Sequence, residues 1–462
     1  DAFGLRDVIA VLPGSRTQGH KVVFVEAHLD SRCADLCDPS CSANGADDNG
    51  SGSVLVIELA RVLSKYTFNH TIVFMLVTGE EHGLLGSRAM AQFCTDQGIE
   101  VKAVQNNDIV GGTICGHTAS PPGCDIPDEI DSTQVRLFSH GTTRGLAQML
   151  ALSYNEKLHS EVPVPMLVSV MDREDRVGRG SDHIPFREAG FQSMRFCAAN
   201  EHGNGDPTTP GYIDHQHTSG DVLGADTDGN SIIDSFYVDF NYLQRNTVIN
   251  GMGLTLLALG PETPDYDVLD EPTGLRVQVN NGSGYSAFRV GVRPVNGGAS
   301  FEALYRTDQT SFIVPGLLAS HVYYVSVAGV DANGITSIFG PEVVRANDAT
   351  TEVAPVDDLP YGLDCLPIGI NESNGWSGTL QLSCGPNPFS GSTAFRITGD
   401  ASVARSAVIV IRDLFGRSIA SIRVASTGSA IAYEHQPAAG LYFADLIIDG
   451  RRADSLRLVA VE

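Results

Sequence analysis

Apolar residues in the first half of the chain recur with two periods, one typical of strands and one of helices. The runs at residues 21–27 (KVVFVEA) and 71–77 (TIVFMLV) are rich in β-branched side chains and predict buried strands. Residues 52–66 place their apolar positions on one side of a helix. The alternation continues with a strand at 7–12, a helix at 84–98, a strand at 101–107 and a helix at 236–259. We therefore expect an α/β domain over residues 1–263, with a mostly parallel sheet flanked by helices.

Beyond residue 271 the pattern changes to short alternating strands separated by Gly, Asn, Asp and Ser. This pattern predicts two small all-β sandwich domains, at residues 264–345 and 379–462. The polar, Pro- and Gly-rich stretch between them, residues 346–378, is expected to be a linker.

Composition narrows the class of protein. The 462 residues are 42% hydrophobic and 18% charged, which is typical of a globular chain. A formal net charge of −25 repels phosphate backbones and argues against nucleic-acid binding. We also expect no membrane span, because no apolar run approaches the roughly 18 residues that one requires.

Nine cysteines indicate an oxidising compartment. Their local spacings, in the cluster Cys33/Cys37/Cys41 and in the pairs Cys115/Cys124 and Cys365/Cys384, favour short disulfide loops. A zinc site in the first cluster is the alternative, although it lacks the paired two-residue spacing of such sites. The sequence begins without a signal peptide, so we expect a processed or truncated chain from a secreted or cell-surface, bacterial extracellular protein.

Side chains that can bind metals follow several of the predicted strands. His28 follows the predicted strand at 21–27, and Asp30 is placed to accept the other N–H of its imidazole. Glu80 and Glu81 follow the most apolar strand, at 71–77. Asp108 ends the next strand. Two further segments carry the acidic pair Asp47-Asp48 in a glycine-rich turn and the histidines His215 and His217. Because the carboxyl ends of parallel strands meet at one edge of a sheet, these segments predict one joint site. Taken singly, the acidic pair could instead cap the following helix.

The order of these motifs resembles that of the secreted di-zinc aminopeptidase family, the leucyl aminopeptidase-like co-catalytic zinc exopeptidases. The motifs are His-x-Asp, Gly-Ala-Asp-Asp-Asn-Gly-Ser-Gly, Gly-Glu-Glu-x-Gly-Leu-Leu-Gly-Ser, an Asp after a strand, Ser-Asp-His-x-Pro-Phe and His-Thr-x-x-Asp. They cover residues 6–259 in family-like spacing.

The resemblance implies two Zn²⁺ per chain. His28 and Asp108 would hold one zinc, Glu81 and His217 the other, and Asp47 would bridge them. Glu80 would act as general base and Asp30 as the partner of His28, while His215 competes with His217 for the last ligand position. Two such cations can activate a shared water for attack on a scissile carbonyl.

Two other motifs of the first domain have open interpretations. His183, in Ser181-Asp-His-Ile-Pro-Phe186, is expected either beside the site or in a structural role, at a helix start capped by the same motif. The Asp-rich stretch 226–234 could bind Ca²⁺ through Asp226, Asp228, Asn230 and Asp234. A solvated turn is the favoured interpretation, because its glycine is displaced from the position in an EF-hand loop.

The two C-terminal modules carry resemblances of their own. Residues 317–334 resemble the later strands of a fibronectin type III sandwich, including its tyrosine corner, but the strand-B tryptophan is missing. In the last module, Pro386-Asn-Pro-Phe389, then Ile411-Arg-Asp-Leu-Phe-Gly-Arg417, then Gly440-Leu-Tyr-Phe443 resemble the sorting domain of type IX secretion substrates, which implies contacts with secretion machinery or the cell surface.

Together these features predict a secreted zinc aminopeptidase that acts on the N-termini of peptides or proteins. The alternatives are a surface structural or adhesive protein with a silent peptidase scaffold, and a metallohydrolase of the same fold acting on another amide.

Overall fold

The structure, a computed structural model, describes residues 4–113, 131–176, 179–199, 206–208, 215–348 and, with internal gaps, 381–460. The chain divides into two compact units, Asp1–Ile368 and Gly369–Glu462, which are described separately. No helix among the described residues is long and apolar enough to cross a membrane.

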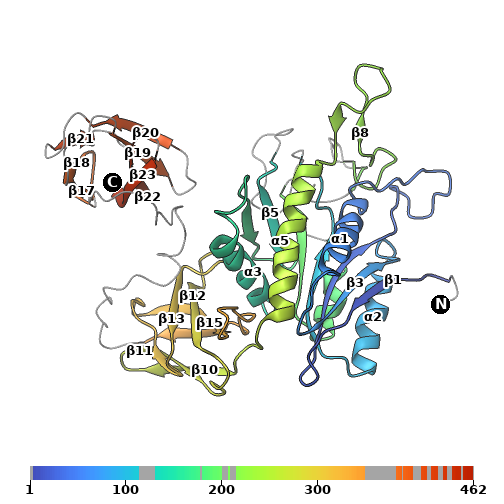
Figure 1. Cartoon of the computed structure of the whole chain (residues 1–462), viewed down its shortest axis with the longest axis horizontal. Coiled ribbons are helices and arrows are strands. Elements are labelled where there is room, and N and C mark those ends of the chain that lie inside the picture. The colour runs from blue at the N-terminus through green and yellow to red at the C-terminus, as the bar shows by residue number, and fades with distance from the viewer. Residues whose placement is uncertain are drawn as a thin grey trace. The chain divides into compact units, whose positions relative to one another are not determined.

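One seven-stranded sheet forms the centre of the first domain, in the order β1-β3-β2-β4-β7-β5-β6 (Figure 1). Its central strands β3, β2, β4 and β7 run parallel, as does the pair β5 and β6. In contrast, β1 pairs antiparallel with β3, and β5 pairs antiparallel with β7. The strands are β1 (Val8–Leu12), β2 (Val22–His28), β3 (Thr71–Val77), β4 (Val101–Asn107), β5 (Gln134–Phe138), β6 (Leu167–Val170) and β7 (Ser193–Ala198).

Helices cover both faces of this sheet. On one face lie α1 (Gly50–Leu63), α3 (Arg144–Lys157) and α5 (Phe240–Leu259); on the other lie α2 (Leu85–Asp96) and α4 (His183–Glu188) (Figure 1). Strand β2 is apolar on both of its faces because each face packs against helices. Val23 and Val25 join the core under α1 and α5, whereas Phe24 joins the core under α2 and α4. Burial on both faces is what a continuous apolar strand requires.

The periodicity of the sequence locates most of these elements closely. The strands expected at 71–77 and 101–107 have those bounds, and the helices expected at 52–66, 84–98 and 236–259 become α1, α2 and α5 with ends shifted by a few residues. The sheet that the sequence predicts as mostly parallel is mixed, because β1, β5 and β6 run opposite to its four central strands.

The following module is a sandwich of a three-stranded and a four-stranded antiparallel sheet. The sheets have the orders β10-β11-β14 and β13-β12-β15-β16. The hydroxyl of Tyr323 accepts a hydrogen bond from the Leu318 N–H at 3.0 Å and so ties the preceding turn to β15. The strands are β10 (Tyr266–Glu271), β11 (Gly274–Val279), β12 (Ala287–Pro294), β13 (Ala303–Thr307), β14 (Ser311–Ile313), β15 (His321–Val330) and β16 (Val343–Asn347).

This module is joined to α3 of the first domain through the carboxylate of Glu342, whose side chain is 4% exposed. It accepts hydrogen bonds from Arg293 Nε at 2.7 Å, Gln148 Nε2 at 2.9 Å and Arg144 Nη1 at 3.1 Å. Two of these donors belong to the first domain and one to β12. One buried acid therefore neutralises an arginine on each side of the joint.

The second unit is another sandwich, with sheets β17-β18-β21 and β20-β19-β22-β23. Phe389 is buried in its core, and the neighbouring Asn387 side chain donates to the Arg457 carbonyl and accepts from the Val459 N–H. The strands are β17 (Gln381–Gly385), β18 (Thr393–Thr398), β19 (Ala407–Asp413), β20 (Ser418–Arg423), β21 (Ile431–Tyr433), β22 (Gly440–Ile448) and β23 (Arg451–Ala460). The turn expected at 415–417 lies outside the described residues. Of the linker expected at 346–378, residues 346–347 belong to β16 and residues 349–378 lie outside the described residues.

We expect Glu342→Gln to destabilise the first unit by about 3 kcal/mol, because it leaves buried arginines without their counter-charge. The measurement is the midpoint of denaturant unfolding followed by circular dichroism, with Glu58→Gln, which breaks the exposed pair of Glu58 with Arg61, as the matched control. Burial alone would raise the pKa of Glu342, but hydrogen bonds from Arg293 and Gln148 lower it below its ordinary 4.5. The stabilisation is therefore present above pH 4.5 and is lost as the pH falls through the lowered value. Equal midpoints for the two variants would contradict this role.

Candidate metal centre

The strand ends bring the predicted site residues together at one edge of the sheet. His28 is the last residue of β2, Glu80 and Glu81 follow β3 in a turn, and Asp108 follows β4. Gly79 adopts a φ of +78°, a conformation that favours glycine and that turns the chain so that both glutamates enter the site. These are neighbouring parallel strands, so their carboxyl ends converge.

The carboxylate of Asp48 lies at the centre of the site, between two imidazoles. Its Oδ1 is 3.3 Å from His28 Nε2 and its Oδ2 is 3.1 Å from His217 Nε2. Asp108 Oδ1 lies 3.5 Å from the same nitrogen of His28, and Glu81 Oε2 lies 3.4 Å from that of His217. Two of the three-residue groups that could hold a metal ion here share Asp48, and a third group joins His28 with Glu80 and Glu81.

The structure corrects the expectation for Asp47. Its carboxylate turns away from the histidines and accepts a hydrogen bond from the Gly111 N–H at 2.9 Å. The neighbouring Asp48 therefore takes the central place. The acidic pair does not cap the helix either, since Asn49 is the N-cap of α1 and accepts from the Gly52 N–H.

The turn that carries Asp48 is held by Asp221. Its two carboxylate oxygens accept the N–H groups of Asp47 at 2.8 Å and of Asp48 at 3.0 Å. Asp221 is 3% exposed and follows His217 by four residues. The His-Thr-x-x-Asp motif therefore supplies both an imidazole and the carboxylate that fixes the facing turn.

Asp30 contacts the site differently from the expectation. The Nδ1 of His28 meets the backbone oxygen of Asp30 at 2.8 Å, while its carboxylate lies 3.9 Å away. That carboxylate instead accepts the N–H groups of Gly79, Glu80 and Glu81 at 2.9, 3.2 and 3.1 Å. Asp30 therefore fixes the imidazole through its main chain and positions the two glutamates through its side chain.

Of the two competing histidines, the structure brings only His217 to the central carboxylate. Its Nδ1 lies 2.8 Å from Arg32 Nη2, and Arg32 Nε donates to Glu81 at 2.7 Å. His217 has a φ of +59°, which is uncommon for a residue with a side chain. The ring of His215 instead stacks on Tyr237 with centroids 3.9 Å apart.

A buried arginine that the sequence interpretation missed holds Asp108 in place. Arg195, in β7, is fully buried and lies 3.0 Å from Asp108 Oδ2, while its other nitrogen is 2.9 Å from Asp175. In the sequence Arg195 is one charged residue within a short apolar strand (SMRFCA), which is the only signal that could have indicated it. A buried arginine needs carboxylate partners, and Asp108 is one of them.

The electrostatics of the site favour cations. Burial raises the pKa of Glu80 well above its usual range. The charge of His28 opposes this effect, and the charges of Asp182, Asp108 and Glu81 add to it. Burial opposes protonation of His217, but hydrogen bonds with Asp48 and Glu81 raise its pKa to about 10. Positive charge is thus favoured at the position between these carboxylates.

A cavity of about 290 Å³ opens over these residues, and its walls fit a metal ion. The Oε1 of Glu81 is buried and has no hydrogen-bond partner among the described residues, so a ligand-type oxygen remains unsatisfied. Carboxylates and imidazoles are the donors that zinc binds. The cavity is lined by His28, Arg32, Asp48, Glu80, Glu81, Gly83, Leu84, Asp108, Arg179, Gly180 and His217.

The remaining sequence-based candidates lie elsewhere. His183 is buried and its Nε2 contacts the Glu174 carbonyl at 3.0 Å, and the Asp182 carboxylate accepts from Ser87 rather than capping the helix. Asp226, Asp228 and Asp234 do gather at an exposed loop beside the hairpin of β8 (Gly224–Ala225) and β9 (Ser235–Phe236). Asp226 there accepts the loop's own N–H groups, as in a solvated turn, and the Asp228 carboxylate contacts Asn230.

The cysteine cluster forms a disulfide between Cys33 and Cys41, and Cys37 is an exposed free thiol, so this cluster holds no three-cysteine zinc site. Cys115, Cys124 and Cys365 lie outside the described residues.

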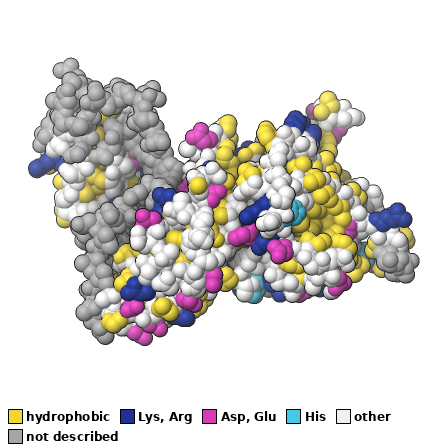
Figure 2. Space-filling view, turned by 60° about the horizontal axis from the view of Figure 1, so that its bottom comes forward, with side chains coloured by type: hydrophobic (Ala, Val, Ile, Leu, Met, Phe, Trp, Pro, Cys, Tyr) yellow, Lys and Arg dark blue, Asp and Glu magenta, His cyan; other side chains and the backbone are white. Residues whose placement is uncertain are grey.

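On the face drawn in Figure 2, basic side chains lie scattered among acidic ones rather than gathered in one patch.

A buried group of carboxylates and imidazoles at the edge of an α/β sheet is the donor set of a metal-dependent enzyme. Residues 7–233 match the family described as Peptidase family M28. A probable zinc metalloprotease of Pyricularia oryzae is 31% identical over 352 residues, which cover 72% of this chain and 67% of the relative. The chain belongs to peptidase family M28, a family of zinc metallopeptidases.

Further similarities cover only part of each protein. A probable zinc metalloprotease of Leptosphaeria maculans is 30% identical over 304 residues, covering 62% of this chain and 66% of the relative. The chain thus spans about two thirds of the length of these curated relatives. The LapA aminopeptidase of Legionella pneumophila superimposes with a TM-score of 0.38 at 24% identity, over 55% of this chain and 56% of that one.

The neighbouring acids Asp47 and Asp48 allow a matched test of the centre. We expect Asp48→Asn to weaken zinc binding by at least about 100-fold. Loss of a residue that only hydrogen-bonds to a metal ligand typically weakens binding ~10–100-fold, and a ligand should matter more. Asp47→Asn should bind zinc like the wild type, because an amide oxygen can still accept the Gly111 N–H. Zinc retained after dialysis against a graded chelator series, measured by atomic absorption, distinguishes the two. The assignment is wrong if the Asp47 variant is the one that loses zinc.

Proposed function

We propose that this chain is a secreted zinc aminopeptidase in which Asp48 bridges two zinc ions. His28 and Asp108 would complete one ion's protein ligands, and Glu81 and His217 those of the other. The observation that carries the proposal is the placement of each Asp48 oxygen against a different imidazole. When bound, the two cations would lower the pKa of a water and polarise the scissile carbonyl.

Glu80 is the proposed general base. Its carboxylate lines the same cavity as the ligand-type residues. Asp30 accepts the N–H groups of the turn that carries it, so the side chain is held at the site by a rigid backbone. From this position the carboxylate can take a proton from a water and then give it to the leaving amine.

The size and charge of the cavity support exopeptidase action on N-termini. A volume of about 290 Å³ suits the end of a peptide better than an extended chain. Three carboxylates beside it, Asp48, Glu81 and Asp108, would attract a free ammonium group as well as the metal ions. An endopeptidase would need an open cleft on both sides of the scissile bond.

The two β-modules fit accessory roles. The three-plus-four strand order and the Tyr323 contact to the Leu318 N–H support a fibronectin type III-like module. In the second unit, Asn387 and Phe389 of the Pro-Asn-Pro-Phe motif fasten its loop to β23, which supports a folded sorting module of the type IX kind. The Cys33–Cys41 disulfide agrees with export to an oxidising compartment.

Glu80→Gln tests the base directly. We expect this variant to keep the zinc content of the wild type and to lose about two to four orders of magnitude in kcat for aminoacyl-anilide hydrolysis. Glu188→Gln, which removes an exposed partner of Arg88, is the control and should keep full activity. Turnover near that of the wild type in the Glu80 variant would show that another group takes the proton.

Chelation tests the activity class. We expect removal of zinc to abolish release of N-terminal residues from peptides, and added zinc to restore it. Hydrolysis of N-acetylated peptides at the same rate as free ones would contradict the aminopeptidase proposal. Full zinc loading without hydrolysis of either peptide would favour a different amide substrate or a silent scaffold.

A further inference from the structure

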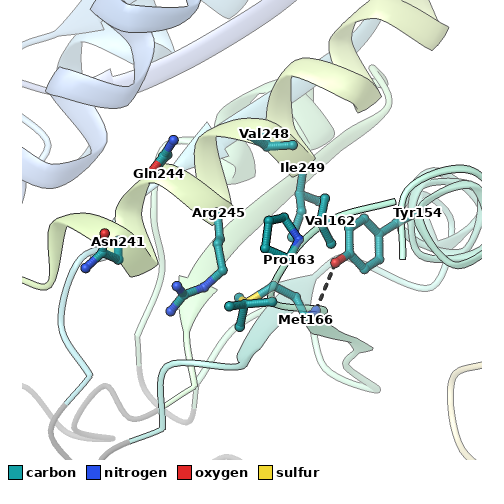
Figure 3. Close-up of a pocket in the computed structure, with 10 residues that line it drawn as sticks. Tyr154, Val162, Pro163, Met166, Asn241, Gln244, Arg245, Val248 and Ile249 are labelled. Carbon is teal, nitrogen blue, oxygen red and sulfur yellow. Dashed lines mark hydrogen bonds between the residues drawn. The ribbon is translucent and has the colours of Figure 1, made fainter. Parts of the chain in front are cut away.

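A second cavity of about 430 Å³ lies between α5, the C-terminal part of α3 and the loop that follows α3 (Figure 3). Its floor is apolar and buried, formed by Tyr154, Met166 and Ile249, each at most 2% exposed. Val164 and Val248 form an exposed apolar rim, at 41% and 43%. The cavity shares no lining residue with the metal centre.

The loop after α3, which forms one wall of this cavity, is fixed to the helix by a hydrogen bond. The Tyr154 hydroxyl accepts a hydrogen bond from the Met166 N–H at 2.8 Å, so the end of the loop is fixed to α3 (Figure 3). Pro163 restricts the backbone in the middle of the same loop. A wall with these restraints forms a preorganised pocket, which keeps the entropic cost of binding low.

One cation reaches into this apolar space. Arg245 extends from α5 beside Pro163 and Met166 (Figure 3). Its Nη2 donates to the Ser132 carbonyl at 2.6 Å, which fixes the guanidinium, while its Nε is buried and has no hydrogen-bond partner among the described residues. The guanidinium is thus fixed by the protein at the wall of an apolar cavity, where a low dielectric strengthens its attraction for an anion.

The charge of the lining points to the same ligand. The chain has 55 acidic residues against 30 Lys and Arg, yet none of the described residues that line this cavity is acidic. None of the described carboxylates forms an ion pair with Arg245 either, whereas Arg144 and Arg195 both have carboxylate partners. The pocket therefore combines apolar walls with a guanidinium that pairs with none of the described carboxylates, in a chain whose formal net charge is −25.

We propose that this pocket binds an aliphatic monocarboxylate of medium chain length. Its carboxylate would pair with the guanidinium of Arg245, which lines the cavity. Its hydrocarbon chain would lie along α5 over Met166 and Ile249. From Asn241 to Ile249 the helix extends roughly 12 Å, enough to accommodate such a chain.

Isothermal titration of decanoate into the zinc-loaded full chain tests the proposal, with 1-decanol as the uncharged probe. We expect one decanoate site, weakened at least tenfold by Arg245→Gln, while 1-decanol binding stays within about twofold. Arg61→Gln, on the exposed face of α1, is the matched control and should leave decanoate affinity unchanged.

Val248→Asp provides a second test at an exposed position that folding does not require. The added carboxylate should repel decanoate and lower its affinity at least tenfold, even if the Arg245 variant fails to fold. No binding of decanoate at millimolar concentration would overturn the proposal. So would equal decanoate affinity in the wild type and either folded pocket variant, which would indicate binding at the zinc ions instead.

Discussion

The contact of one carboxylate with two imidazoles is the interaction on which the rest of the site depends. Asp48 can lie between His28 and His217 only because Asp221 holds the turn before α1 and because β2 ends at His28. His217 and Asp221 are four residues apart, so a single segment sets both the second imidazole and the turn facing it. A displacement of that segment would therefore separate the two halves of the site.

The surrounding structure keeps these charges in place at a free-energy cost. Buried carboxylates repel each other unless cations or hydrogen-bond donors compensate them. Arg195, on the neighbouring strand β7, compensates Asp108, and the N–H groups of the turn at 79–81 compensate Asp30. Arg32 donates to Glu81, and His217 lies close to the same carboxylate oxygen, but the other oxygen of Glu81 has no hydrogen-bond partner among the described residues. At the cavity, a bound cation can supply the remaining compensation.

Sequence patterns predict the strands and helices of this protein better than the pairing of distant strands or the orientation of single side chains. The apolar run 71–77 can only be a strand buried on both faces, and it is β3. The antiparallel pairing of β5 with β7 joins strands about sixty residues apart, and periodicity carries no information about such pairings. Asp47 and Asp48 are adjacent acids in one turn. Only the path of the backbone decides which of them enters the site.

Helix α5 links three parts of the first unit: the metal centre, the apolar pocket and the module that begins at β10. Asp239, which caps its N-terminus, donates its own N–H to the Gly111 carbonyl, beside the turn that carries Asp47. Its outer side forms one wall of the apolar pocket. At its C-terminal end the Gly260 carbonyl accepts from buried Lys102, and Glu262 pairs with Lys21. Both ends of α5 are therefore held by neighbouring structure, one beside the turn of the metal centre and the other at the joint to the module that follows.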